Sequence, residues 1–156
     1  MPHAHLTVAS LATLRQLFNT LSPAGPDLRN GFFRARFIGP AWLRLSAGPC
    51  VALSGLPGWQ GKRFLDSSQA TNILLRHGKV QEKFHMQCSE RPSLIDGRPG
   101  VDLSYGEQGP IPWRWLRDEL RVLDENTLLG MTVIDLPLLR NLAFPFLLSR
   151  DHEPGL

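Results

Sequence analysis

Cysteine is scarce in this sequence of 156 residues, and long apolar runs are absent. Its two cysteines, Cys50 and Cys88, have the spacing of neither a disulfide framework nor a zinc site, so we expect two free thiols. No run approaches the roughly 18 apolar residues that a membrane-spanning helix needs. The first residues also lack the basic leader and apolar core of a secretory signal. These absences predict a protein of the cytoplasm without a membrane partner.

The sequence also has only a small excess of positive over negative charge. Seventeen Lys and Arg residues stand against fourteen Asp and Glu residues, which gives a net charge of +3. An excess this small and this scattered argues against a nucleic-acid partner. With 42% hydrophobic and 20% charged residues, the composition is typical of a soluble globular protein, and the length fits a single domain over residues 1–156. The oligomeric state stays open.

Motifs for metals and cofactors are absent too. No two of the five histidines have metal-ligand spacing. The sequence contains no glycine-rich phosphate loop and no serine in an elbow motif. Cys88 shares a strand face with apolar residues, where a cysteine is usually a small hydrophobe. We therefore expect neither a metal site nor a cofactor.

Proline and glycine, in contrast, are plentiful, with 13 and 14 residues. They predict short elements joined by turns instead of a helix bundle. Apolar residues at helical spacing predict a helix over residues 7–21. Residues 40–55 are also apolar, but Gly48 and Pro49 interrupt them, so we expect two short pieces that cover one end of a sheet. We expect residues 151–156 to form a loose tail.

Residues 31–150 carry the signals of β-strands. Residues 31–37 alternate with period two, and tight turns are expected at three later places. These places are His77-Gly78, Asp96-Gly97 and residues 124–126. Seven or eight strands at such intervals favour a mainly β (α+β) fold. We expect a curled antiparallel sheet or a lipocalin-like small β-barrel, with an N-terminal helix and a short helical cover segment.

Two carboxylates fall on strand faces that are otherwise apolar. Regular alternation places Glu82 on the face of Phe84, and Asp118 on the face of Leu120. A buried carboxylate is costly unless it is paired, protonated or beside a wet cavity. One interpretation is a structural ion pair, or a β-bulge that turns the side chain outward. The other is a polar anchor or a general acid/base inside a barrel, which makes Asp118 and Glu82 the candidate catalytic residues.

The stretch GLPGWQGKRF at residues 55–64 combines glycines, aromatic rings and cations. Its glycines allow a tight bend and a close approach of the backbone to its neighbours. Regular alternation places Lys62 on the side of Phe64, and Arg63 on the side of Trp59. A cation therefore lies beside an aromatic ring, either as a rim residue in contact with water or as a partner for a ligand. We expect this strand to form one wall of a pocket.

Asp118 is expected opposite Lys62, as the other charge of a pair inside that pocket. The pair would leave one polar point in an apolar chamber, because each charge offsets the desolvation of the other. Trp113 and Tyr105 are either aromatic core or further pocket wall. The candidate ligand-binding residues are Trp59, Lys62, Phe64, Tyr105, Trp113 and Asp118.

Three segments of the chain resemble a known family. GWQGKRF, and later RDELRVLDENTLLGMTVIDL with FPFLLSR, are similar to the small bacterial proteins of the GXWXG type and to the domain of unknown function that follows that motif. In the name-giving motif, Phe33 stands where the family has tryptophan, and Ala35 where it has the second glycine. The resemblance implies a divergent relative with a compact, largely β fold related in outline to lipocalin-like ligand binders. The family has no assigned activity to carry over.

Three functions stay open at this stage. The first is binding of a small apolar or amphiphilic molecule in a barrel cavity, with Lys62 and Asp118 at its polar end. The second is a small enzyme of the isomerase, cyclase or hydrolase type that uses Asp118 or Glu82 as general acid/base. The third is a filled barrel whose surface binds another protein. We expect the first, with a small apolar or amphiphilic molecule as the partner.

Overall fold

The computed structural model describes residues 3–152 and residue 154. A short 3-10 helix, η1 (Ala4–Val8), precedes the α-helix α1 (Leu11–Thr20). The two are separate because Ala9 is extended and Ser10 caps α1, its Oγ accepting a hydrogen bond from the Thr13 amide at 3.1 Å. The N-terminal helix is therefore confirmed, but its predicted start at residue 7 is wrong. Part of the predicted tail, residues 153, 155 and 156, lies outside the described residues.

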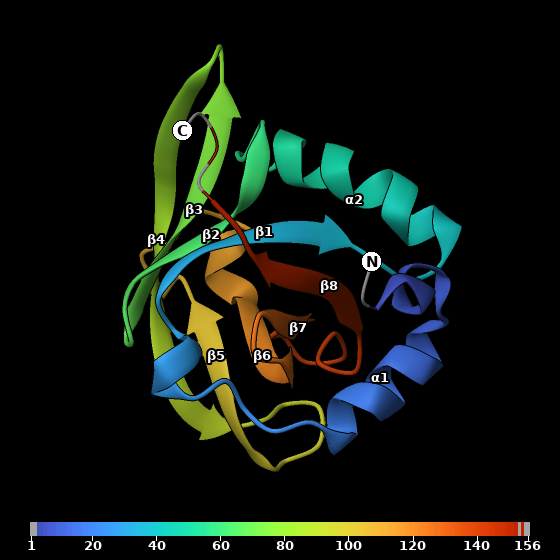
Figure 1. The fold of residues 1–156 in the computed structure, drawn as a ribbon. Helices are drawn as coiled ribbons and strands as arrows, with labels where there is room; N and C mark the ends of the chain where they lie inside the picture. Colours follow the sequence, from blue (N-terminus) through green and yellow to red (C-terminus); the bar gives the residue numbers. More distant parts are fainter. Residues whose placement is uncertain (1–2, 153, 155–156) are drawn as a thin grey trace.

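Eight strands form a closed antiparallel barrel in which each strand pairs with the next and β8 pairs with β1 (Figure 1). The strands are β1 (Gly31–Phe37), β2 (Trp59–Asp66), β3 (Gln69–Arg76), β4 (Lys79–Pro92), β5 (Pro99–Ser104), β6 (Leu116–Asp124), β7 (Thr127–Ile134) and β8 (Ala143–Arg150). Two further 3-10 turns are η2 (Pro26–Leu28) and η3 (Trp113–Trp115). The predicted mainly β fold is confirmed, and the sheet closes.

The three predicted turns all connect neighbouring strands. His77 and Gly78 join β3 to β4, and both have a positive φ, 53° and 74°, as a two-residue hairpin turn of the I′ type requires. Asp96-Gly97 lies between β4 and β5, and residues 124–126 turn the chain from β6 into β7. The turn residues therefore predicted correctly where one strand ends and its neighbour in the sheet begins.

The interior of the barrel changes character along its length. Phe33 on β1, Phe64 on β2 and Leu120 on β6 belong to one packed cluster, in which the Phe33 and Phe64 rings meet edge to face at 5.8 Å. Farther along β1, Phe37 packs against this cluster and also lines a cavity. One end of the barrel is therefore filled by side chains and the other is hollow.

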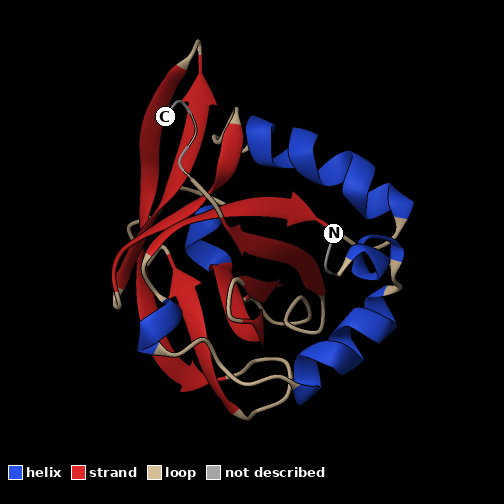
Figure 2. Ribbon diagram, in the orientation of Figure 1, coloured by secondary structure: helices blue, strands red, loops and turns tan. Residues whose placement is uncertain are grey.

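Both α-helices lie along one side of the strands in Figure 2. Leu14 and Phe18 of α1 are buried against the outer face of the barrel, where Leu129, Met131 and Leu147 lie. The helix thus covers an apolar outer face that β7 and β8 would otherwise expose to water.

The segment between β1 and β2 forms one helix, α2 (Ala41–Leu53), with Pro49 inside it. The prediction of two short pieces is wrong. A proline removes one amide donor from a helix, here the partner of the Leu45 carbonyl. Both residues lie on the exposed side of α2, where water can hydrate that carbonyl, so the helix continues past Pro49. No helix within the described part of the chain is long and apolar enough to cross a membrane.

Candidate functional site

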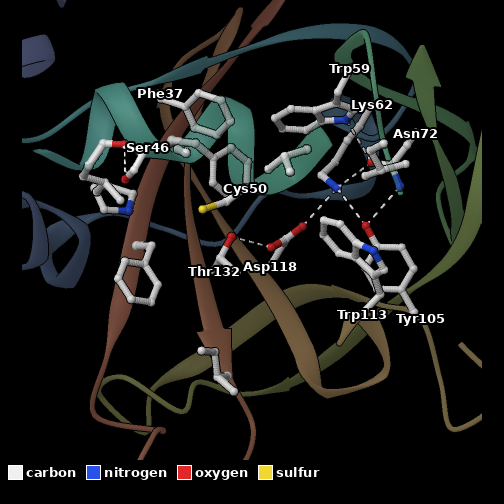
Figure 3. Close-up of a pocket in the computed structure, with 18 of the residues that line it drawn as sticks. Phe37, Ser46, Cys50, Trp59, Lys62, Asn72, Tyr105, Trp113, Asp118 and Thr132 are labelled. Carbon is white, nitrogen blue, oxygen red and sulfur yellow. Dashed lines mark hydrogen bonds and ion pairs between the residues drawn. The ribbon is translucent and has the colours of Figure 1, made fainter. Parts of the chain in front are cut away.

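A cavity of about 440 Å³ lies at the hollow end of the barrel, beneath α2 (Figure 3). Its wall is mainly apolar: α2 contributes Leu43, Ala47 and Val51, and the strands contribute rings such as Phe37 and Phe146. The volume lies within the roughly 300–1,000 Å³ that is usual for small-molecule sites. The cavity is therefore large enough for an organic ligand.

Lys62 and Asp118 meet inside this cavity. Their strands, β2 and β6, lie on opposite walls of the barrel, and Nζ of Lys62 is 3.0 Å from Oδ2 of Asp118. The two residues are only 2% and 6% exposed. Oγ1 of Thr132 donates to Oδ1 of Asp118 at 2.7 Å, so both carboxylate oxygens have a partner. The structure therefore brings together the two charges that the sequence placed opposite each other.

Asn72 connects this pair to Tyr105. Oδ1 of Asn72 accepts from Nζ of Lys62 at 3.1 Å and from the indole nitrogen of Trp59 at 3.0 Å. Its Nδ2 donates to Oη of Tyr105 at 3.0 Å and to the main-chain oxygen of Phe84 at 3.3 Å. We call Lys62, Asn72, Tyr105, Asp118 and Thr132 the polar floor of the cavity. A buried network of this kind holds each member in one orientation.

The polar floor sets the protonation states of two groups. Burial is the largest influence on the pKa of Lys62 and lowers it, but Asp118 and Tyr105 together raise that pKa above its ordinary value of 10.5. Burial, again the largest influence, raises the pKa of Tyr105 above 10.0, against the opposing effect of Lys62. At neutral pH, Lys62 is therefore an ammonium and Tyr105 an un-ionised phenol.

Aromatic rings surround the polar floor. The Trp113 ring lies 5.6 Å from the Tyr105 ring and 6.1 Å from that of Phe84. The indole nitrogen of Trp113 donates to the main-chain oxygen of Ser54 at 2.7 Å, which ties η3 to the end of α2. Of the predicted ligand-binding residues, Trp59, Lys62, Tyr105, Trp113 and Asp118 all line the cavity.

A β-bulge in β2 turns Trp59 toward the cavity. The register between β2 and β3 slips by one residue between Trp59 and Gly61, so Trp59 and Lys62 reach the same interior. The prediction that Trp59 shares a side with Arg63 is wrong, because it assumed unbroken alternation. The bulge is what allows the indole to donate to Asn72 beside the ammonium of Lys62.

Phe64 does not line the cavity. It lies in the packed cluster, 3% exposed and against Phe33. The prediction that Phe64 contacts a ligand is corrected for a simple reason: two residues beyond Lys62, β2 has already passed from the hollow end into the filled end of the barrel.

Glu82 does not face the interior either. Its side chain is 48% exposed and pairs with Arg63 on the outside of the barrel. The prediction of an inward Glu82 is wrong because β4 carries a bulge at Phe84, whose φ is +57°, where the register with β3 slips between Ala70 and Asn72. Asp118 is thus the one of the two predicted carboxylates that lines the cavity.

The sequence predicted that residues 40–55 cover one end of the sheet, but not that Asn72, Thr132 and side chains of α2 line the cavity. Asn72 is 0% exposed and stands in the apolar strand TNILLR, and Thr132 stands in the apolar strand TLLGMTVI. A polar residue inside such a strand was the available signal, because a buried amide or hydroxyl needs a partner. Cys50, on α2, also lines the cavity and is exposed.

No group of three or more His, Cys, Asp or Glu side chains within the described residues could hold a metal ion. No family model and no curated protein matches the chain. The chain is similar to one solved structure, the crystal structure of a protein from Thermomonospora curvata. The two share 18% sequence identity over 93% of this chain and 90% of that one, with a TM-score of 0.69. At this identity the likeness shows the fold alone.

Proposed function

We propose that the protein binds a small apolar or amphiphilic molecule in the cavity beneath α2. The observation that carries the proposal is an apolar chamber of about 440 Å³ with a single buried polar floor. Apolar walls bind hydrocarbon by releasing it from water, and a few fixed polar groups orient it. An eight-stranded barrel can be filled completely by its own side chains. Here the packed cluster fills the other end of the barrel in this way. Because side chains fill one end of this barrel and leave a cavity at the other, a lipocalin-like ligand binder is favoured over a filled barrel that binds proteins on its surface.

Binding is favoured over catalysis by the state of Asp118. A general base needs an oxygen aimed at the proton it removes. Here Thr132 and Lys62 each engage one oxygen of Asp118, at 2.7 Å and 3.0 Å. Glu82, the other predicted acid/base, lies outside the barrel. These contacts support a structural carboxylate within a binding site.

We also propose that the chain is a divergent relative of the GXWXG-type proteins. The support is the sequence match of the segment GWQGKRF, in which Gly58, Trp59, Gly61, Lys62 and Phe64 fit the pattern of that family. The two free thiols support the further proposal of a cytoplasmic location.

Titration with N-phenyl-1-naphthylamine, an uncharged dye that fluoresces in apolar surroundings, tests the binding proposal. Ala47 lines the cavity, whereas Ala41 lies exposed on the same helix and does not. Ala47→Trp should fill the chamber and weaken binding by roughly tenfold or more, and Ala41→Trp is the matched control that should keep it. Equal binding by the Ala47→Trp protein, or no saturable binding by the wild type, would contradict the proposal.

A further inference from the structure

The donors of the polar floor are almost all used inside the protein. The ammonium of Lys62 has three hydrogens. Its partners are Asp118 at 3.0 Å and Asn72 at 3.1 Å, with Sδ of Met86 at 3.3 Å and Oη of Tyr105 at 3.5 Å. The hydroxyl of Thr132 donates to Asp118. Neither the ammonium nor this hydroxyl is left to bind a ligand.

The orientation of Asn72 decides the role of Tyr105. An indole N–H and an ammonium can only donate, so the atom of Asn72 that meets both Trp59 and Lys62 is its oxygen. Its amide nitrogen therefore faces Oη of Tyr105 at 3.0 Å and donates to it. The phenol oxygen is thereby an acceptor, and its own hydrogen must go elsewhere.

No acceptor for the Tyr105 hydrogen is found among the residues that the structure describes. The two hydrogen bonds at its oxygen both arrive from donors, Asn72 and Lys62. The indole of Trp113 is satisfied by Ser54. Trp42 lies at the mouth of the cavity and is 58% exposed, where water can serve it. The Tyr105 hydroxyl is thus the unused donor deep in the cavity.

We propose that the Tyr105 hydroxyl anchors the ligand, and that the polar end of the ligand is an uncharged carbonyl oxygen, as in a ketone, aldehyde or ester. This inference rests on the proposed function and specifies the ligand class of the same cavity. The group that binds the ligand is then the phenol of Tyr105 and not the ion pair. Lys62 and Asp118 hold Tyr105 and Asn72 in position.

The charges of the cavity explain why the carbonyl is uncharged. Among the described residues that line it, Lys62 and Asp118 are the charged ones, and they neutralise each other. A carboxylate that entered would lose its water without gaining a free cation. An uncharged carbonyl costs less free energy to desolvate than a carboxylate does, and one hydrogen-bond donor satisfies it. The nearby ammonium polarises the Tyr105 O–H and strengthens its donation.

Three naphthalene probes of matched shape test the inference: 2-acetylnaphthalene, the alkene 2-isopropenylnaphthalene, and 2-naphthoate. Calorimetric titration of the wild type and of Tyr105→Phe measures each affinity. The variant should weaken binding of the ketone roughly three- to tenfold, the effect of one lost hydrogen bond, and that of the alkene less than about twofold. The carboxylate should bind the wild type at least about tenfold more weakly than the ketone does.

Infrared spectroscopy gives a readout that a merely structural role of Tyr105 would not move. The carbonyl stretch of 2-acetylnaphthalene bound to the wild type should lie below its frequency in an apolar solvent, and should rise toward that frequency in Tyr105→Phe. Binding of ketone and alkene with no effect of Tyr105→Phe and no shift would overturn the inference and leave the proposed function standing. Tighter binding of 2-naphthoate would overturn the uncharged class. Failure of all three probes to bind, with N-phenyl-1-naphthylamine still bound, would overturn the inference alone. Failure of the dye as well would overturn both.

Discussion

Lys62 and Asp118 form an ion pair that spans the interior of the barrel, with 3.0 Å between Nζ and Oδ2 and with one residue on each of two opposite strands. Thr132 and Asn72 hold the two charges from either side. Because both groups are nearly inaccessible to water, neither can lose its partner without leaving a buried group unpaired.

Asp118→Asn should destabilise the protein by roughly 3–5 kcal/mol, because it leaves the ammonium of Lys62 buried without its counter-charge. The double variant Lys62→Met/Asp118→Leu should recover most of that loss, because no charge then stays in the interior. Urea unfolding measures both. A single variant that loses less than about 1 kcal/mol would show that water reaches Lys62.

The stability gap between the wild type and Asp118→Asn should narrow as the pH rises toward about 10. In the wild type the pKa of Lys62 is raised above 10.5, so its contribution is full below that pH and is lost only as the pH rises through the folded value. In the variant, burial without Asp118 lowers the folded pKa, so the unfolded chain binds more protons and the variant gains stability with pH. If the difference in the free energy of urea unfolding stays constant as the pH rises toward about 10, the pairing of Lys62 with Asp118 is contradicted.

Asp96→Asn should destabilise the protein at neutral pH by on the order of 3 kcal/mol. Asp96 accepts two hydrogen bonds, at 2.6 Å and 2.8 Å, from Arg121, which is only 1% exposed. The Arg121 guanidinium lowers the pKa of Asp96 to about 2, from 3.8. The contribution of Asp96 to the free energy of unfolding is present above pH 3.8 and is lost as the pH falls through about 2. The difference in stability between the wild type and the variant should therefore close between these two pH values. If the difference in stability persists at pH about 2, the ion pair of Asp96 with Arg121 is not its source.

Gly61→Ala should cost at least about 3 kcal/mol, because the new Cβ would lie 2.0 Å from the main-chain oxygen of Phe33. Gly78→Ala is the matched control. Its φ is +74° and nothing lies within 4 Å of the added Cβ, so only the backbone conformation costs energy, about 1–2 kcal/mol. Thermal or urea unfolding compares the two. Equal losses would mean that β1 and β2 do not approach as closely as described.

Cys50 should react with a thiol reagent in the folded protein, and Cys88 only after unfolding, because Cys50 is exposed and Cys88 is buried. Burial is also the largest of the influences that raise the pKa of Cys88, which slows its reaction further. Because Cys50 lines the cavity, saturation with 2-acetylnaphthalene should slow its labelling. Mass spectrometry counts the labels with time. A labelling rate unaffected by the probe would argue that the probe binds elsewhere.

Period-two patterning and turn residues predicted a curled antiparallel sheet or a small barrel, because alternation and three of the turns have local sequence signals. Closure could not be predicted, because the pairing of β1 with β8 joins segments far apart in the sequence. Asp118 followed from the same rule, because β6 runs without interruption through residues 116–122. Trp59 and Glu82 were placed on the wrong faces because bulges shift the register, and a bulge depends on contacts with the neighbouring strand. The continuity of α2 through Pro49 depended likewise on which side of the helix meets water.

A crystal structure of the protein saturated with 2-acetylnaphthalene would show directly whether the cavity beneath α2 is the ligand site. We expect the naphthalene rings to lie beneath α2, between Val51 and Trp113, with the carbonyl oxygen within hydrogen-bond distance of Oη of Tyr105. A probe bound on the outer surface of the barrel, with the cavity holding only water, would contradict it.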